Sequence, residues 1–191
     1  ASLFMVAGVV LHEAGTQKFE NLSGLGKRWP LLAAVATVSG LSMAGIPPLN
    51  GFYSKELLFE ASYHAASHSE ALSWIIPGVA VLGSVFTFLY SMKFVSVFYG
   101  NLSLELPEVS RLLVVPPALL AFAALTIGLA PNGFVDFLIE PALGSVSGSH
   151  HGMSVSLFSL KPSVAMSALT MFTGFLAFRR LSMVERKIRG A

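Results

Sequence analysis

The sequence contains no cysteine among its 191 residues, so it can form no disulfide and can hold no zinc ion or iron–sulfur cluster through thiolates. Charged residues are also scarce. They make up 12% of the chain, whereas about 25% is usual in soluble domains. Hydrophobic residues account for 54% of the chain, and the mean hydropathy is +0.71. The composition therefore predicts an integral membrane protein whose surroundings are a lipid bilayer.

Motifs for catalysis and ligand binding are missing as well. The chain has no Gly-x-Ser-x-Gly, no P-loop, no Rossmann glycine fingerprint and no metalloprotease motif, so we expect no cofactor and assign no catalytic residue. The net charge is only +2 and no basic patch alternates with aromatic residues, which argues against a nucleic-acid partner. His150 and His151 stand together in a Gly/Ser-rich stretch, but a metal site needs more ligands than this pair, and we expect no metal.

Four apolar segments are long enough to cross a membrane, and they predict an all-α fold, a polytopic transmembrane helix bundle. They cover residues 31–63, 74–99, 112–130 and 162–178. A shorter apolar run over residues 1–11 is typical of the second half of a spanning helix, so we expect the chain to be part of a larger membrane domain. Residues 134–143 mix apolar and acidic residues, which predicts a short helix at the membrane surface.

The first long segment is predicted to be a discontinuous helix. As one straight helix, residues 31–63 would measure roughly 50 Å, against a hydrocarbon core of about 30 Å. The segment is interrupted by Pro47 and Pro48, which cannot donate backbone hydrogen bonds, and Gly51 follows closely. We therefore expect a helix break at Pro47, Pro48 and Gly51. Broken helices with charge nearby are a recurring way to build ion sites in transporters.

The distribution of basic residues predicts how the chain crosses the membrane. Lys and Arg gather before the first long segment, after the second one and in the C-terminal tail, whereas the other two connections together contain only Lys161. Under the positive-inside rule, the basic connections and the tail are cytoplasmic in a multi-pass protein of the cell membrane. The residues concerned are Lys18, Lys27, Arg28, Arg111, Arg179, Arg180, Arg186, Lys187 and Arg189.

Lys55 follows the expected break, and the residues alone leave two interpretations of it open. Desolvation disfavours an ammonium and a nearby carboxylate favours it, so a lysine at membrane depth can gain and lose a proton and act as a relay. Glu56 and Glu60 lie one helical turn apart on a shared face beside it. Alternatively, Lys55 lies at the far membrane surface and extends its ammonium into the headgroup water.

Lys93 and His64 are further candidates for a proton path. Lys93 lies late in the second long segment, where it either anchors the helix at the surface or forms the cytoplasmic end of the path. His64 and His68 follow the broken segment at helical spacing, and histidine titrates near neutral pH. Their position favours a solvated helix end, with a proton exit as the alternative.

Three stretches together resemble a known family. They are Ser2-Leu-Phe-Met-Val-Ala-Gly8 with His12-Glu-Ala-Gly-Thr16, Leu22-Ser-Gly-Leu-Gly-Lys-Arg-Trp-Pro30, and Leu41-Ser-Met-Ala-Gly-Ile-Pro-Pro-Leu-Asn-Gly-Phe-Tyr-Ser-Lys-Glu56. They are similar to the antiporter-like membrane subunits, and most similar to the large, A-type subunit of Mrp-type multisubunit cation/proton antiporters. The homologous L-type subunit of respiratory complex I has a less similar pattern.

This resemblance implies a function and a role for Lys55. In the family, the lysine at this position is the terminal proton relay of the membrane channel, in a bundle built from inverted repeats. The resemblance implies exchange of protons for Na+ or another monovalent cation, with other membrane subunits as partners. The alternatives are the proton-pumping subunit of complex I or of a related membrane hydrogenase, and a structural subunit without transport.

Overall fold

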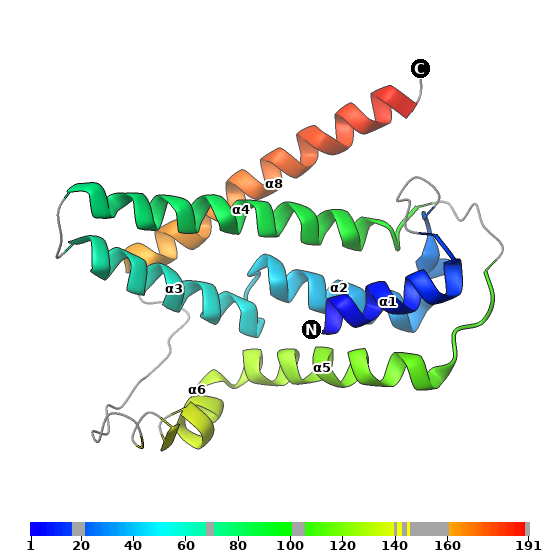
Figure 1. Ribbon diagram of the computed structural model, residues 1–191, viewed down its shortest axis with the longest axis horizontal. Helices are drawn as coiled ribbons and strands as arrows, with labels where there is room; N and C mark the ends of the chain where they lie inside the picture. Colours follow the sequence, from blue (N-terminus) through cyan, green and yellow to red (C-terminus); the bar gives the residue numbers. More distant parts are fainter. Residues whose placement is uncertain are drawn as a thin grey trace.

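The computed structural model describes residues 1–16, 22–67, 71–100, 106–139, 141–142, 145 and 161–189, and these residues form an assembly of helices (Figure 1). In chain order the helices are α1 (Ser2–Ala14), the short turn η1 (Leu25–Lys27), α2 (Pro30–Ala44), α3 (Asn50–Ser67), the short turn η2 (Ala71–Trp74), α4 (Ile75–Ser96), α5 (Arg111–Leu129), α6 (Pro131–Phe134), the wider turn η3 (Val135–Ile139) and α8 (Pro162–Arg189). The described part of the chain contains no strand.

The predicted long segment is two helices, α2 and α3, that are separated by residues 45–49. They follow each other along the bundle, with α4 on one side and α5 on the other, and each of these two helices packs on both halves (Figure 1). α1 lies against α2 and α5, whereas α8 crosses α4 and α3. Continuous helices therefore hold the break in the middle of the bundle. The predicted all-α membrane bundle with one discontinuous helix is confirmed.

Membrane-crossing character is plain in the described residues. Three helices are long and apolar enough to span a bilayer, namely α4, α5 and Pro162–Met183 of α8, while α1 and α2 are shorter apolar helices. Only about a fifth of the residues in each of these three spans are buried inside the chain. Large apolar side chains such as Leu112, Phe86 and Phe172 are exposed instead. These faces are suited to lipid or to other membrane-embedded protein.

The main apolar core lies where α1, η1 and α2 meet the end of α4 and the start of α5. Val6, Leu25 and Phe98 are almost fully buried there. A chain of hydroxyl groups links the same helices, because Ser39 Oγ donates to Ser2 Oγ at 2.8 Å and Ser2 Oγ donates to the carbonyl oxygen of Pro117 at 2.8 Å. Packing and buried hydrogen bonds thus fix α2 between α1 and α5, which positions one side of the break.

Element bounds differ from the expected ranges at several ends. α1 continues to Ala14, where Gly15 takes a left-handed conformation and ends the helix. The short surface helix begins earlier than expected, at Pro131, and continues as the wider turn η3. α8 extends far beyond residue 178, to Arg189, because the basic tail continues the same helix. Such ends depend on capping and packing rather than on apolar length alone.

Candidate functional site

The break is built by a glycine followed by two prolines. Gly45 ends α2 in a left-handed conformation, with φ at 84°, which costs a residue without a side chain little. The Gly45 N–H donates to the carbonyl oxygen of Ser42 at 3.0 Å, and the Ile46 N–H donates to the carbonyl oxygen of Leu41 at 3.1 Å. This pattern closes a helix end. The prolines that follow disfavour a continuation of the helix, since they have no N–H.

Lys55 reaches back across the break to the end of α2. Its ammonium donates a hydrogen bond to the carbonyl oxygen of Ala44 at 2.9 Å. The last carbonyls of a helix lack partners within the helix and carry a partial negative charge. A cation from α3 is therefore stabilised at the C-terminal end of α2. No ion pair of Lys55 occurs among the described residues.

Gly45 also makes room for the Lys55 side chain. A Cβ atom at Gly45 would lie 2.7 Å from Lys55 Cδ and 3.3 Å from Lys55 Nζ. The glycine thus serves both the left-handed turn and the passage of the lysine. The sequence pattern points to Pro47, Pro48 and Gly51 at the break and misses Gly45 in this second role, since the role depends on a contact ten residues along the chain.

Ser42 and Asn50 brace the break from its two sides. Ser42 Oγ donates to Asn50 Oδ1 at 2.6 Å and accepts the N–H of Gly51 at 3.3 Å. A Cβ atom at Gly51 would overlap the Ser42 carbonyl group, so the first turn of α3 touches the end of α2 directly. On the other side, Gly128 of α5 lies against the backbone of Pro48 and Leu49. These contacts fix the geometry in which Lys55 meets Ala44.

Glu56, the next residue after Lys55, is buried. Glu56 is only 6% exposed, and its Oε2 atom has no hydrogen-bond partner in the described part of the structure. Four other buried polar atoms share this property, and all lie on α3, α4 or α8, which pack on one another. They are the hydroxyl groups of Tyr53, Ser91, Ser163 and Ser167. We refer to this set, with Glu56, as the polar seam.

Glu60 has an ion-pair partner that sequence reasoning did not assign to it. Lys161, which directly precedes α8, places its Nζ atom 2.8 Å from Glu60 Oε1. This hydrogen bond and the negative charge raise the pKa of the Lys161 ammonium above its usual value. Lys161 has apolar neighbours along the chain and no local signal of this contact. The pair joins α3 to the start of α8, next to the polar seam.

His64 and Lys93 lie at opposite ends of the site. His64 is exposed near the end of α3, with its ring edge-on to Tyr63 at 6.3 Å. Lys93 lies in the last turn of α4 and lines a cavity of about 600 Å³ together with Tyr90, Tyr99 and Phe178. His64 lies nine residues after Lys55 on α3, and Lys93 belongs to another helix, α4. His68 and the pair His150–His151 lie outside the described residues.

Titratable side chains follow one another along α3. Glu56, Glu60 and His64 follow one another at four-residue spacing along α3, so they share one face from the break to the helix end. Within the described residues, no three histidine, aspartate or glutamate side chains gather in a way that could hold a metal ion. The arrangement offers titratable groups in a row rather than a ligand cage.

Comparisons with known proteins show what this chain is similar to. Residues 1–87 match the family described as NADH:quinone oxidoreductase/Mrp antiporter, transmembrane. The chain is 38% identical over 156 residues to the Na(+)/H(+) antiporter subunit A1 of Staphylococcus aureus strain JH9, covering 76% of this chain and 20% of that protein. The same subunit of strain Newman has the same identity and coverage.

A solved structure has the same arrangement of helices. The structure of the Mrp complex from Dietzia sp. DQ12-45-1b contains a chain that matches with a TM-score of 0.73 and 30% identity, covering 97% of this chain and 20% of that chain. The sequence described here thus spans about a fifth of the length of the relatives that it matches. The match includes the break and the helices around it.

Proposed function

Because residues 1–87 of this chain belong to the transmembrane family of NADH:quinone oxidoreductases and Mrp antiporters, we propose that it is part of a membrane subunit that exchanges protons for Na+, with Lys55 as a proton relay. The observation that carries this proposal is the hydrogen bond from Lys55 to the Ala44 carbonyl oxygen across the helix break. Lys55 is partly buried, and a cation beside unwound backbone at membrane depth is a functional feature by default, since it is costly to keep there.

The partner of Lys55 suits a residue that must both gain and lose a proton. A carboxylate partner would strongly favour the charged ammonium, whereas a neutral carbonyl oxygen favours it less. A neutral amine still has N–H groups to donate, so the contact with Ala44 can persist after the proton has left. The lysine can therefore stay in place while its charge changes, which is what a relay requires.

The onward path from Lys55 runs along α3 in this proposal. Glu56 stands next to Lys55 in the chain, and Glu60 and His64 follow it on the same face toward the end of the helix. The polar seam adds buried hydroxyl groups on α4 and α8, the helices that pack on α3. Buried polar groups are usually satisfied by protein or by ordered water. Water in this seam would connect Glu56 to the ion pair of Glu60 and Lys161.

Lys93 would lie at the other end of the path. It stands at the end of α4, on the side of the bundle where α2 begins, and the cavity beside it is open to solvent-sized molecules. The positive-inside rule assigns this side and the C-terminal tail to the cytoplasm. Proton uptake near Lys93 and release near His64 follow from this orientation. The apolar faces of α4, α5 and α8 supply area for contacts with lipid and with the other membrane subunits of the complex.

A second candidate is a proton-pumping subunit of the complex I type. The matching family includes NADH:quinone oxidoreductase by its description, and the same lysine arrangement would serve a pump. The relatives that we find by sequence are named Na(+)/H(+) antiporter subunits, and the matching structure is of an Mrp complex. For this reason antiport is the favoured function.

The experiment uses everted membrane vesicles that contain the full parent complex. A pH gradient is imposed across the vesicle membrane, and its collapse on addition of Na+ is followed with a fluorescent dye, in the parent, in Lys55→Ala and in Lys27→Ala. Lys27 is an exposed lysine of η1 and serves as the matched control. We expect Na+-dependent collapse in the parent and the control, and its loss in Lys55→Ala.

Two outcomes would contradict the proposal in different ways. A normal Na+ response in Lys55→Ala would remove Lys55 from the proton path. Absence of any Na+ response in the parent, together with acidification driven by NADH, would assign the chain to a complex I-type pump. The amount of assembled complex is measured by blue native electrophoresis, so that loss of protein is separated from loss of transport.

A further inference from the structure

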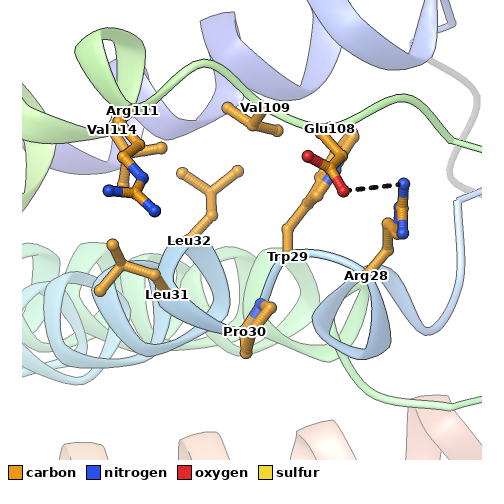
Figure 2. Close-up of a pocket in the computed structure, with 9 residues that line it drawn as sticks. All are labelled: Arg28, Trp29, Pro30, Leu31, Leu32, Glu108, Val109, Arg111 and Val114. Atoms are coloured by element: carbon orange, nitrogen blue, oxygen red, sulfur yellow. Dashed lines mark ion pairs between the residues drawn. The ribbon is translucent and has the colours of Figure 1, made fainter.

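A basic cavity lies where α2 and α5 begin, at the end of the bundle away from η2. It has a volume of about 370 Å³ and lies between the first turns of the two helices and residues 108–109, which precede α5. Figure 2 shows Arg28 and Arg111 at opposite ends of the cavity, with Trp29 and Leu32 between them. No part of the proton path described above lines this cavity.

Positive charge dominates the cavity. Arg28 is held in place by a hydrogen bond from its Nε atom to the carbonyl oxygen of Leu106 at 3.2 Å. Its Nη2 atom lies 3.5 Å from Glu108 Oε1, a pair drawn as a dashed line in Figure 2. Arg111 has neither an ion pair nor a hydrogen bond of its side chain among the described residues. The residues that line the cavity therefore include two guanidinium groups and one carboxylate.

The two helix starts add to this positive charge. Neither α2 nor α5 has a side-chain cap at its N-terminus, and neither has an acidic residue in its first turn. The N-terminus of a helix carries a partial positive charge that favours anions. Arg111 is the first residue of α5, a position that disfavours a cation unless an anion lies nearby. A guanidinium group binds phosphate well because two of its N–H groups can donate to two phosphate oxygens at once.

The rest of the surroundings are apolar and include exposed leucines. Leu31 is 61% exposed and Leu112 is 82% exposed, and each follows the first residue of its helix. Val109 and Val114 line the cavity itself. The Trp29 indole N–H donates to the carbonyl oxygen of Pro107 at 2.9 Å, which holds the chain before α5 against the start of α2. A ligand here would meet a guanidinium group at each end of the cavity and exposed leucines beside it.

We propose that this cavity binds the headgroup of an anionic phospholipid such as phosphatidylglycerol, with its acyl chains on the exposed leucines. Basic pockets between transmembrane helices are suited to anionic headgroups. A free phosphate ion would satisfy the charge but would leave the apolar surface uncovered. The lipid would join the starts of α2 and α5 and so support one flank of the broken helix. The site is independent of whether the parent protein is an antiporter or a pump.

The test uses the full parent complex in liposomes of phosphatidylethanolamine with a small share of a photoactivatable lipid. One sample contains photoactivatable phosphatidylglycerol and the other contains the phosphatidylcholine analogue with the same chains. After illumination, labelled peptides are identified by mass spectrometry in the parent, in Arg28→Gln/Arg111→Gln and in Arg180→Gln. Arg180 is exposed on α8, outside the cavity, and controls for general loss of charge.

We expect phosphatidylglycerol to label peptides with residues 28–32 and 109–114 in the parent. In the double variant this labelling should fall by roughly fivefold or more for each arginine removed, which is the contribution of one basic residue to binding at an anionic surface. Arg180→Gln should keep the labelling. Equal labelling by the two lipids, or unchanged labelling in the double variant, would overturn the proposal. So would removal of the label by millimolar inorganic phosphate, which would identify a free-anion site.

Discussion

Lys55 and Ala44 lie on opposite sides of the helix break, and the Lys55 ammonium donates a 2.9 Å hydrogen bond to the Ala44 carbonyl oxygen. The contact joins a titratable side chain of one half-helix to the free backbone end of the other. Anything that displaces either half therefore changes the surroundings of the lysine. This gives the break a direct influence on the proposed relay, which substitutions at neighbouring glycine and serine residues can measure.

Gly45→Ala should damage transport more than the size of a methyl group suggests. The left-handed conformation at Gly45 costs an alanine about 1–2 kcal/mol. The added Cβ would also stand 2.7 Å from Lys55 Cδ, which forces the lysine away from Ala44. We expect slower Na+-dependent proton exchange in vesicles and a lower thermal midpoint of the purified complex.

Gly78→Ala is the matched control for this change. Gly78 lies in α4 with nothing within 4 Å of an added Cβ, and alanine favours a helix there. We expect wild-type exchange and an unchanged or slightly higher thermal midpoint. Equal behaviour of the two variants in both measurements would show that Gly45 leaves the position of Lys55 unaffected.

Ser42→Ala should loosen the break without a change in charge. The buried Ser42 hydroxyl donates to Asn50 Oδ1 and accepts the Gly51 N–H, and its removal leaves both partners short of a bond. The loss should lower the free energy of unfolding by about 1–3 kcal/mol. Ser54→Ala is the control, because the exposed Ser54 hydroxyl only bonds the Asn50 carbonyl of its own helix. Thermal unfolding of the two variants in detergent distinguishes them, and equal midpoints would argue against the brace.

Some of this site follows from local chemistry, and the rest depends on tertiary packing. A double proline alone does not stop a helix, because α5 continues through Pro116 and Pro117. The sequence predicts the break because Pro47 and Pro48 interrupt a segment too long for one straight span, and apolar length predicts an all-α membrane bundle. The hydrogen bond of Lys55 to Ala44 depends on how α3 docks onto α2, which no spacing rule gives. The ion pair of Glu60 and Lys161 joins positions 101 residues apart. The buried side of α8 is likewise decided by its contacts with α3 and α4.

Glu56→Gln should slow transport while leaving the fold in place. The amide has nearly the shape of the carboxyl group but cannot take up and release a proton. If Glu56 passes protons from Lys55 into the polar seam, exchange should fall by about a hundredfold, the lower range for a positioned proton-transfer group. The control is Glu13→Gln on α1, whose carboxylate pairs with His12 at 3.2 Å, away from α3. Full exchange in Glu56→Gln vesicles would exclude Glu56 from the path.

The pair of Glu60 and Lys161 should stabilise the protein up to alkaline pH and then stop doing so. Glu60 raises the pKa of Lys161 in the folded state, so the stabilisation is fully present below the usual lysine pKa of about 10.4. It disappears as the pH rises through the raised folded-state pKa, because neutral Lys161 no longer attracts the carboxylate.

Thermal midpoints of the parent, Glu60→Gln, Lys161→Gln and the double variant, measured from pH 7 to 11, give the coupling between the two residues. We expect a small positive coupling at pH 8 that weakens with added salt, since the pair is partly exposed. A coupling that persists unchanged at pH 11 would mean that packing, rather than charge, joins α3 to the start of α8.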